Sequence, residues 1–218
     1  MKECGIDEAG RGPVIGPLCI AGVLIDEKDL PKLKAINVKD SKLIQNHHME
    51  RYAKKILDII EDHKIIVIQP QEIDAALNNP NLNLNWLEAI KAAEIINTLK
   101  ADRVIVDSPS NNLSAFQAYL ENLFQYKPKE VRCEHKADAN YLSVAAASIL
   151  AKDAREKEVK KLKEFIGIDF GSGYPADPKT QKFIKDYHAQ FPEIFRQTWQ
   201  TYKDVLAGKK QKKLDDFE

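Results

Sequence analysis

The chain alternates between short apolar runs and longer stretches in which apolar residues recur every three or four positions. Residues 3–8 and 17–26 are predicted to be two strands joined by a glycine-rich loop, and the second of them is a short apolar, β-branched run. Short runs of this kind, rich in Val and Ile and bounded by turn residues, are typical of buried strands. The same pattern predicts further strands at residues 65–68, 103–106 and 131–134.

Helical spacing of apolar residues fills most of the segments between these strands. It predicts helices over residues 49–60, 86–99 and 113–124, and a long helix from about residue 140 to about residue 165. Two initial strands with no room for a helix between them, followed by strand–helix alternation, predict an α/β fold with a mixed sheet flanked by helices. The region after Gly167 is predicted to be a helical appendage that ends in a polar tail.

Composition narrows the class of protein. A chain of 218 residues, 44% hydrophobic and 30% charged, is expected to form one soluble globular domain with at most a small appendage. The formal net charge of zero argues against a polycation but allows a basic groove that is offset by acids elsewhere. The three cysteines, Cys4, Cys19 and Cys133, have no metal-ligand spacing and favour a reducing compartment. With no signal peptide or membrane-length apolar run, we expect a cytoplasmic monomer without a membrane partner.

Candidate chemistry begins at residues 5–13, Gly-Ile-Asp-Glu-Ala-Gly-Arg-Gly-Pro. Two adjacent carboxylates, the ligand type preferred by hard cations such as Mg²⁺, precede a loop with two glycines and an arginine. Glycines let backbone N–H groups approach a phosphate or sugar closely, and an arginine adds a fork of donors. The segment indicates metal-assisted chemistry on a phosphate ester, although the same string alone is compatible with a surface turn.

Two further acids stand where a site could form. Asp107 follows a predicted strand, and ligands of α/β folds bind at the carboxyl ends of strands, but Asp107 could equally be a turn residue before Pro109. Asp138 precedes the long helix and could equally cap it. Adjacent residues on a regular strand point to opposite faces, so Asp7 and Glu8 share a site only if their strand ends or bulges there. Four clustered carboxylates would need cations to offset their repulsion.

The order of motifs along the chain is similar to that of one known family. The motifs are the segment at 5–13, Asp-Ser-Lys at 40–42, Val-Asp at 106–107, His-Lys-Ala-Asp at 135–138, Ala-Ala-Ala-Ser-Ile-Leu-Ala-Lys at 145–152 and Gly-Ser-Gly-Tyr-Pro at 171–175. The chain closely resembles the type 2 ribonucleases H (ribonuclease HII), most of all their archaeal branch, from residue 5 to about residue 200. The resemblance implies a ribonuclease H-like mixed five-stranded sheet flanked by helices, with a C-terminal helical appendage.

The resemblance also implies an activity and its metal. The expected enzyme hydrolyses the RNA of RNA–DNA hybrids and incises duplex DNA on the 5′ side of embedded ribonucleotides, leaving 3′-hydroxyl and 5′-phosphate ends. Two Mg²⁺ or Mn²⁺ ions would be bound by the catalytic acids. Carried over by motif, these acids are Asp7, Glu8, Asp107 and Asp138.

Substrate contacts and domain limits are implied in the same way. The glycine loop, with Gly10, Arg11 and Gly12, would bind the ribonucleotide and its phosphate, and Tyr174 would stack at the RNA–DNA junction. Lys42, Lys152 and Arg155 would hold the nucleic-acid backbone, although Asp153 adds a negative charge beside them, where the family commonly has valine. The catalytic domain would span residues 1–166. A helical extension that completes the substrate groove would span residues 167–208, and a flexible tail would span residues 209–218.

The tail carries a separate hypothesis. Gln211, Leu214 and Phe217 follow the pattern Gln-x-x-aliphatic-x-x-aromatic and resemble the short peptides by which replication enzymes dock on a sliding clamp. Such peptides usually end in two aromatic residues, whereas Glu218 occupies the second position. The alternative is a disordered charged tail without a partner.

Two other functions compete with the ribonuclease. A clamp-tethered nucleic-acid-binding factor that has lost catalysis would lack one of the carboxylates, and none is missing. Another nuclease of the ribonuclease H fold, such as a DNA resolvase or an exonuclease, would keep the acids but lack the Gly-Arg-Gly loop and Tyr174.

Overall fold

The structure, a computed structural model, describes residues 1–38 and 46–208 and contains the predicted mixed sheet. Its strands are β1 (Lys2–Ala9), β2 (Leu18–Asp26), β3 (Asp62–Ile68), β4 (Arg103–Asp107) and β5 (Glu130–Glu134). They lie in the order β3-β2-β1-β4-β5. β2 runs antiparallel to both β1 and β3, whereas β4 runs parallel to both β1 and β5. The expected five-stranded mixed sheet is confirmed.

The helices are α1 (Leu30–Ala35), α2 (Asn46–Leu57), α3 (Pro70–Leu77), α4 (Leu84–Leu99), α5 (Leu113–Glu121), α6 (Ala137–Asn140), α7 (Leu142–Ile166), α8 (Pro178–Tyr187) and α9 (Gln200–Leu206), with 3₁₀ turns η1 (Glu27–Asp29) and η3 (Pro192–Ile194). The four helices predicted from apolar periodicity correspond to α2, α4, α5 and α7 to within a few residues, whereas α1, α3 and α6 were not predicted. Among the described residues, none of the helices is long and apolar enough to cross a membrane.

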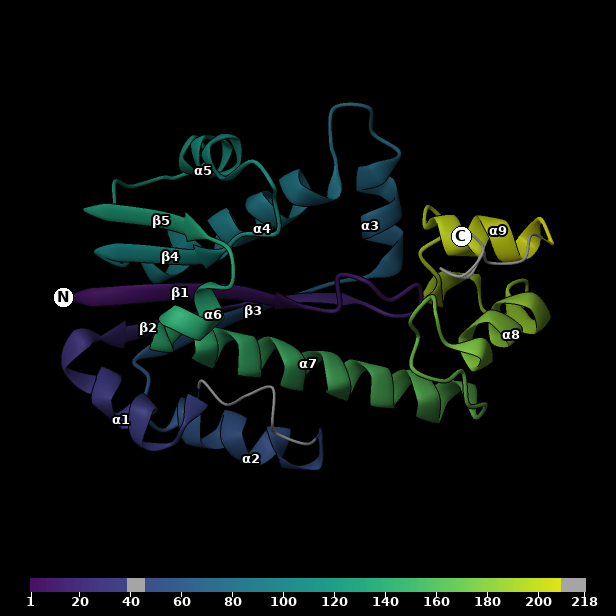
Figure 1. Cartoon of the computed structure of the whole chain (residues 1–218), viewed down its shortest axis with the longest axis horizontal. Coiled ribbons are helices and arrows are strands. Elements are labelled where there is room, and N and C mark those ends of the chain that lie inside the picture. The colour runs from purple at the N-terminus through teal and green to yellow at the C-terminus, as the bar shows by residue number, and fades with distance from the viewer. Residues whose placement is uncertain (39–45, 209–218) are drawn as a thin grey trace, which may run out of the picture.

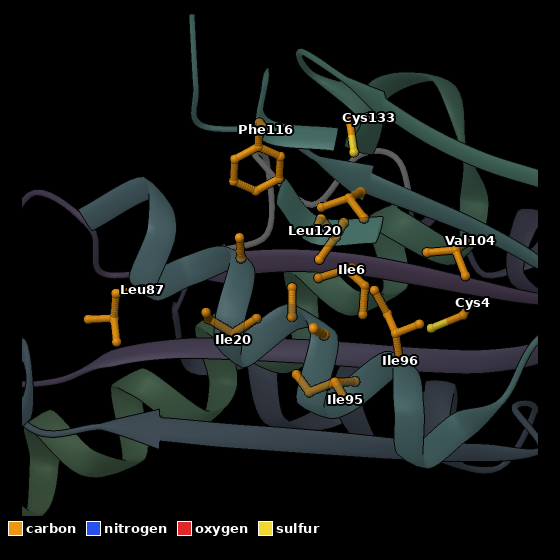
Figure 2. Packing of buried hydrophobic residues seen from close by; sticks show 14 of the residues in the cluster. Cys4, Ile6, Ile20, Leu87, Ile95, Ile96, Val104, Phe116, Leu120 and Cys133 are labelled. Carbon is orange, nitrogen blue, oxygen red and sulfur yellow. The ribbon is translucent and has the colours of Figure 1, made fainter. Parts of the chain in front are cut away.

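Helices cover both faces of the sheet (Figure 1). On one face, α4 and α5 pack against the apolar side chains of the central strands, with Ile95 and Ile96 of α4 close to Ile6 and Ile20 (Figure 2). On the other face lies α7, and α1 and α2 pack beneath it. Because β1 is buried from both sides, the residues at its C-terminal end are fixed in position.

The helix α7 approaches β1 unusually closely. A Cβ atom added at Gly5 would lie 2.3 Å from the backbone carbon of Ser143, the second residue of α7. The small residues of Ala145–Ala146–Ala147 are fully buried at this face and let the helix backbone come near the sheet. Glycine at position 5 is therefore a packing requirement, and it fixes the distance between α7 and the strand that carries Asp7.

The C-terminal helices pack against the loop that follows β1. Val14 and Ile15 share an apolar cluster with Phe170, Phe183 and Phe195. The amide N–H of Val14 donates to the carbonyl oxygen of Gly173 at 2.8 Å, and an isolated bridge pairs Ile15 with Phe195. Figure 1 shows α8 and α9 at the end of the sheet where β1 stops. The chain after residue 167 thus holds the glycine loop from outside the sheet.

Gly5→Ala tests the close contact between α7 and β1. The added methyl group meets backbone rather than a movable side chain, so we expect a loss of about 3 kcal/mol in the free energy of unfolding. Urea unfolding followed by circular dichroism measures this loss. Gly12→Ala is the control, because its Cβ would contact only the Tyr174 ring at 3.4 Å, and its expected change is within about 0.5 kcal/mol. Equal stability of both variants would contradict the packing requirement.

Candidate active site

Two of the predicted acids lie side by side at the C-terminal ends of neighbouring parallel strands. Ile6 of β1 is in register with Val106 of β4, so the next residues, Asp7 and Asp107, occupy adjacent positions. Parallel strands aligned in this way direct equivalent side chains to the same face. Asp7 is 6% exposed, whereas Asp107 at the strand end is half-buried. The sheet thus brings together two carboxylates that are far apart in the sequence.

Asp138 comes to the same region through the short helix α6. The amide N–H of Ala137 donates to Oδ1 of Asp107 at 3.3 Å, which brings the start of α6 to the end of β4. Asp138 follows as the second residue of α6, and its charge contributes to the electrostatics of Asp7. The alternative that Asp138 caps the long helix is wrong, because α7 begins at Leu142 and its N-cap position is Tyr141.

Glu8 points to the other face of the sheet. The antiparallel register between β1 and β2 shows no bulge at Glu8, but β1 ends one residue later, at Ala9. The charges of Asp7 and Asp107 act on Glu8, so these carboxylates lie near one another at this end of the sheet. Asp7 accepts a hydrogen bond from Ser148 on α7, whereas the charge of Glu88 on α4 acts on Glu8. The structure therefore places Asp7 with Asp107 and Asp138, and Glu8 beside them on the α4 side.

Burial and mutual repulsion shift the pKa values of these acids upward. Burial, reinforced by the charges of Asp107 and Asp138, raises the pKa of Asp7 from 3.8 to about 7. Burial and the neighbouring carboxylates of Asp7, Glu88 and Asp107 raise the pKa of Glu8 well above its ordinary value. Positive charge near such a group of acids stabilises their ionised forms, and Arg11 acts on Glu8 in this way.

The chemistry of this donor set fits a hard divalent cation. All four predicted ligands are carboxylates, and oxygen donors are preferred by Mg²⁺ and Mn²⁺. Among the described residues, however, no three acidic, imidazole or thiol side chains are already gathered closely enough to hold a metal ion together. Carboxylates repel one another in the absence of a cation, and a bound cation would offset that repulsion.

The glycine loop stands next to the acids, and its arginine is held by α4. Nε of Arg11 donates to Oε1 of Glu88 at 2.9 Å, and Nη2 donates to Oδ1 of Asn85 at 2.6 Å. Burial raises the pKa of Glu88 to about 7, despite the ion pair with Arg11. The Arg11 side chain is thus fixed by two neighbours while remaining partly exposed.

The predicted substrate contacts Gly10, Gly12, Arg155 and Tyr174 also come together. Gly10 has a φ of +89°, and a Cβ there would lie 2.4 Å from Cδ of Arg155. The guanidinium carbon of Arg155 lies 5.7 Å from the centre of the Tyr174 ring. Tyr174 is 45% exposed and its ring is the nearest neighbour of Gly12. Arg155 itself is buried, so the exposed part of this group is the Tyr174 ring beside the glycine loop.

The negative charge of Asp153 is paired with a lysine of the same helix, α7. Its carboxylate accepts a hydrogen bond from Nζ of Lys157 at 2.8 Å, and the Asp153 side chain is mostly buried. Lys152 is half-buried one turn before Arg155. Of the other predicted site residues, Lys42, Gln211, Leu214 and Phe217 lie outside the described residues.

Sequence reasoning missed the residues that hold the glycine loop in place. They are Asn85 and Glu88 on α4, and Arg196 and Trp199 before α9. Glu88 and Arg196 could have been noticed as charged residues within apolar surroundings, and both are buried. Nothing local to Asn85 or Trp199 signals a contact with residues more than seventy positions away.

Comparison with known proteins identifies close relatives. A family model described as Ribonuclease HII matches residues 4–202. The ribonuclease HII of Pyrococcus furiosus is 44% identical over 226 residues, which cover 100% of this chain and 98% of the relative. The crystal structure of ribonuclease H2 from Pyrococcus horikoshii OT3 has a TM-score of 0.88 at 40% identity, covering 95% of this chain and 98% of that one. The structure of the PCNA:RNase HII complex from Archaeoglobus fulgidus has a TM-score of 0.82 at 40% identity, and the match covers 99% of this chain and 100% of that chain.

The raised pKa of Asp7 predicts how metal binding depends on pH. Because the folded pKa is about 7 and the ordinary value is 3.8, the metal-free protein loses stability as the pH rises from about 4 through about 7. A saturating divalent cation offsets the ionised carboxylates. It should raise the melting temperature by about 5–10 °C at pH 8 and by much less at pH 5.

Differential scanning fluorimetry with Mg²⁺ or Mn²⁺, against a metal-free sample in EDTA, measures this shift. Asp7→Asn should abolish most of it, whereas Asp58→Asn, which changes an exposed acid just after α2, should leave it intact. An equal shift at both pH values, or one that survives Asp7→Asn, would show that the ions bind elsewhere.

Proposed function

The chain belongs to the ribonuclease HII family, and we propose that it incises duplex DNA on the 5′ side of embedded ribonucleotides with two divalent metal ions. Membership makes it a type 2 ribonuclease H, a hydrolase that cuts the RNA of RNA–DNA hybrids. The observation that carries the finer proposal is the adjacency of Asp7 and Asp107 to the loop of Gly10, Arg11 and Gly12.

In this proposal the acids form the catalytic centre. Asp7 and Asp107 would hold the ions, either Mg²⁺ or Mn²⁺, from the ends of β1 and β4. Asp138 would contribute from α6, and Glu8 from the side of α4. When bound, such ions activate a water molecule and stabilise the leaving 3′ oxygen, so the products carry 3′-hydroxyl and 5′-phosphate ends. Ser148 keeps the Asp7 carboxylate oriented by donating a hydrogen bond to it.

Recognition of the ribonucleotide is proposed for the loop and for Tyr174. A 2′-hydroxyl is the one group that distinguishes RNA from DNA at a given position, and backbone groups can detect it without reading the base. Arg11 would contact the phosphate, and Tyr174 offers a half-exposed flat ring for stacking at the junction. Lys42, Lys152 and Arg155 would hold the backbone.

We also propose that residues 1–166 carry the catalysis, while residues 167–208 complete the groove. Packing of Phe170 and Phe195 against Val14 and Ile15 supports this division of roles, because it places the extension beside the glycine loop.

Cleavage of a labelled DNA duplex with a single ribonucleotide tests the proposal. With Mg²⁺ or Mn²⁺ we expect one cut on the 5′ side of the ribonucleotide and no cut in an all-DNA duplex of the same sequence. Asp107→Asn removes a metal ligand that is worth several kcal/mol in the transition state, so kcat should fall by about 10³-fold or more.

Asp58→Asn serves as the matched control and should cleave normally. Equal cutting of the all-DNA duplex would favour a general nuclease of the same fold. An uncut substrate with either metal would favour a binding factor, and full activity of Asp107→Asn would remove that residue from the centre.

A second proposal concerns the partner of the tail. The Archaeoglobus fulgidus protein, 40% identical to this chain, has been solved in complex with PCNA, a sliding clamp. We propose that Gln211, Leu214 and Phe217 bind the clamp of the same organism in the manner of a short docking peptide. With Glu218 in place of a second aromatic residue, the affinity should be lower than that of a peptide with two.

Phe217→Ala tests the docking peptide. Removing an aromatic anchor typically costs at least 2 kcal/mol, so we expect the Kd for the clamp to rise by about 30-fold. Isothermal titration calorimetry of the full chain with the clamp measures this change. Phe165→Ala, which removes another exposed aromatic ring (75% exposed) at the end of α7, should leave the Kd unchanged. Unchanged binding by Phe217→Ala would exclude the tail as the docking element.

A further inference from the structure

All three carbonyl groups of Gly10–Arg11–Gly12 are bound by one short segment of the C-terminal extension. Nη2 of Arg196 donates to the carbonyl oxygen of Gly10 at 2.6 Å, and Nη1 donates to that of Arg11 at 2.9 Å. Nε1 of Trp199 donates to the carbonyl oxygen of Gly12 at 3.2 Å. Two side chains separated by three positions thus hold the loop nearly two hundred residues away in sequence.

This arrangement fixes the direction of the loop's N–H groups. No cis peptide bond occurs among the described residues, and in a trans peptide the carbonyl and the following N–H point in opposite directions. Because the carbonyls of Gly10 and Arg11 point to Arg196, the N–H groups of Arg11 and Gly12 point away from it. Neither N–H group has a hydrogen-bond acceptor among the described residues. The third peptide ends in Pro13, which has no N–H.

Arg196 binds backbone carbonyl groups of the loop rather than a carboxylate. Its side chain is fully buried, and no carboxylate lies within salt-bridge distance among the residues the structure describes. Nε also donates to the carbonyl oxygen of Gly16 at 3.0 Å, and the guanidinium lies 4.9 Å from the centre of the Trp199 ring. Burial and the nearby Arg155 lower the pKa of Arg196 to about 9. A buried charge without an ionic partner is costly, and here backbone carbonyls compensate it.

We propose that Arg196 and Trp199 are positioning residues that set the preference for a ribonucleotide. They hold the N–H groups of Arg11 and Gly12 as a fixed pair of donors directed at the ribose of the substrate. The planar guanidinium presents its donors as a rigid fork that reaches carbonyls on different sides, whereas the donors of a lysine radiate from a single nitrogen. This inference rests on the proposed function, because it assigns the residues behind the loop that senses the ribonucleotide.

Trp199→Phe and Arg196→Lys test the inference in the full chain. Trp199→Phe removes one donor and keeps an aromatic ring, whereas Arg196→Lys keeps the charge and loses the fork. The measurements are KM and kcat for a duplex with one ribonucleotide, and the inhibition constant of an all-DNA duplex added as competitor. The ratio of that inhibition constant to KM reports the preference for a ribonucleotide.

We expect this ratio to fall by about 5-fold in Trp199→Phe and by about 30-fold in Arg196→Lys, in line with one and with two to three lost hydrogen bonds. The inhibition constant of the all-DNA duplex should remain unchanged, because it does not depend on a 2′-hydroxyl. Tyr202→Phe, which removes a hydroxyl from the same apolar cluster without touching the loop, is the control and should keep the ratio.

Three outcomes would overturn the inference. One is an unchanged ratio in Trp199→Phe. Another is that KM and the all-DNA inhibition constant rise by the same factor in either variant while its melting temperature falls. That result would indicate that the residue has a structural role only. The third is a loss of the ratio in Tyr202→Phe as well. Failure of the proposed function is distinguishable, because the unmodified protein itself would then show no preference for the ribonucleotide.

Discussion

The parallel pairing of β1 with β4 is the constraint on which the rest of the site depends. It sets Asp7 beside Asp107 in a region that is buried from both faces, where two carboxylates repel each other strongly. Gly5 lets α7 close over β1, and Ser148 on that helix then reaches Asp7. The same packing that stabilises the sheet therefore concentrates negative charge at one end of it. A divalent cation is the natural compensation for that charge.

The glycine loop depends on a second layer of contacts that spans the whole chain. Helix α4 fixes the side chain of Arg11 through Glu88, and the C-terminal extension fixes the loop backbone through Arg196. The loop is thus held by two separate elements, although it has no regular structure of its own. Preorganised donors of this kind need little rearrangement when a substrate binds. The C-terminal extension is consequently part of the candidate recognition surface rather than an accessory.

The apolar pattern predicted the five strands and the long helix, because local periodicity reports burial directly. Residue patterns picked out the acids one by one, and only the family resemblance grouped them, since the register of Ile6 with Val106 is a tertiary fact. Local sequence also left open whether Asp138 caps the long helix, and the intervening helix α6 excludes this. Arg196 and Trp199 were missed because their partners lie more than 180 residues away. Hydrogen bonds from side chains to a distant backbone leave no periodic signal.

The most direct measurement is anomalous X-ray diffraction from crystals of the active protein soaked in Mn²⁺. The account predicts anomalous peaks in direct coordination with Asp7 and Asp107, with Asp138 and Glu8 completing the ligand set. Crystals that show ordered acids but no peak at the ends of β1 and β4, or a peak held by other residues, would contradict the central claim that this buried carboxylate pair is the metal centre.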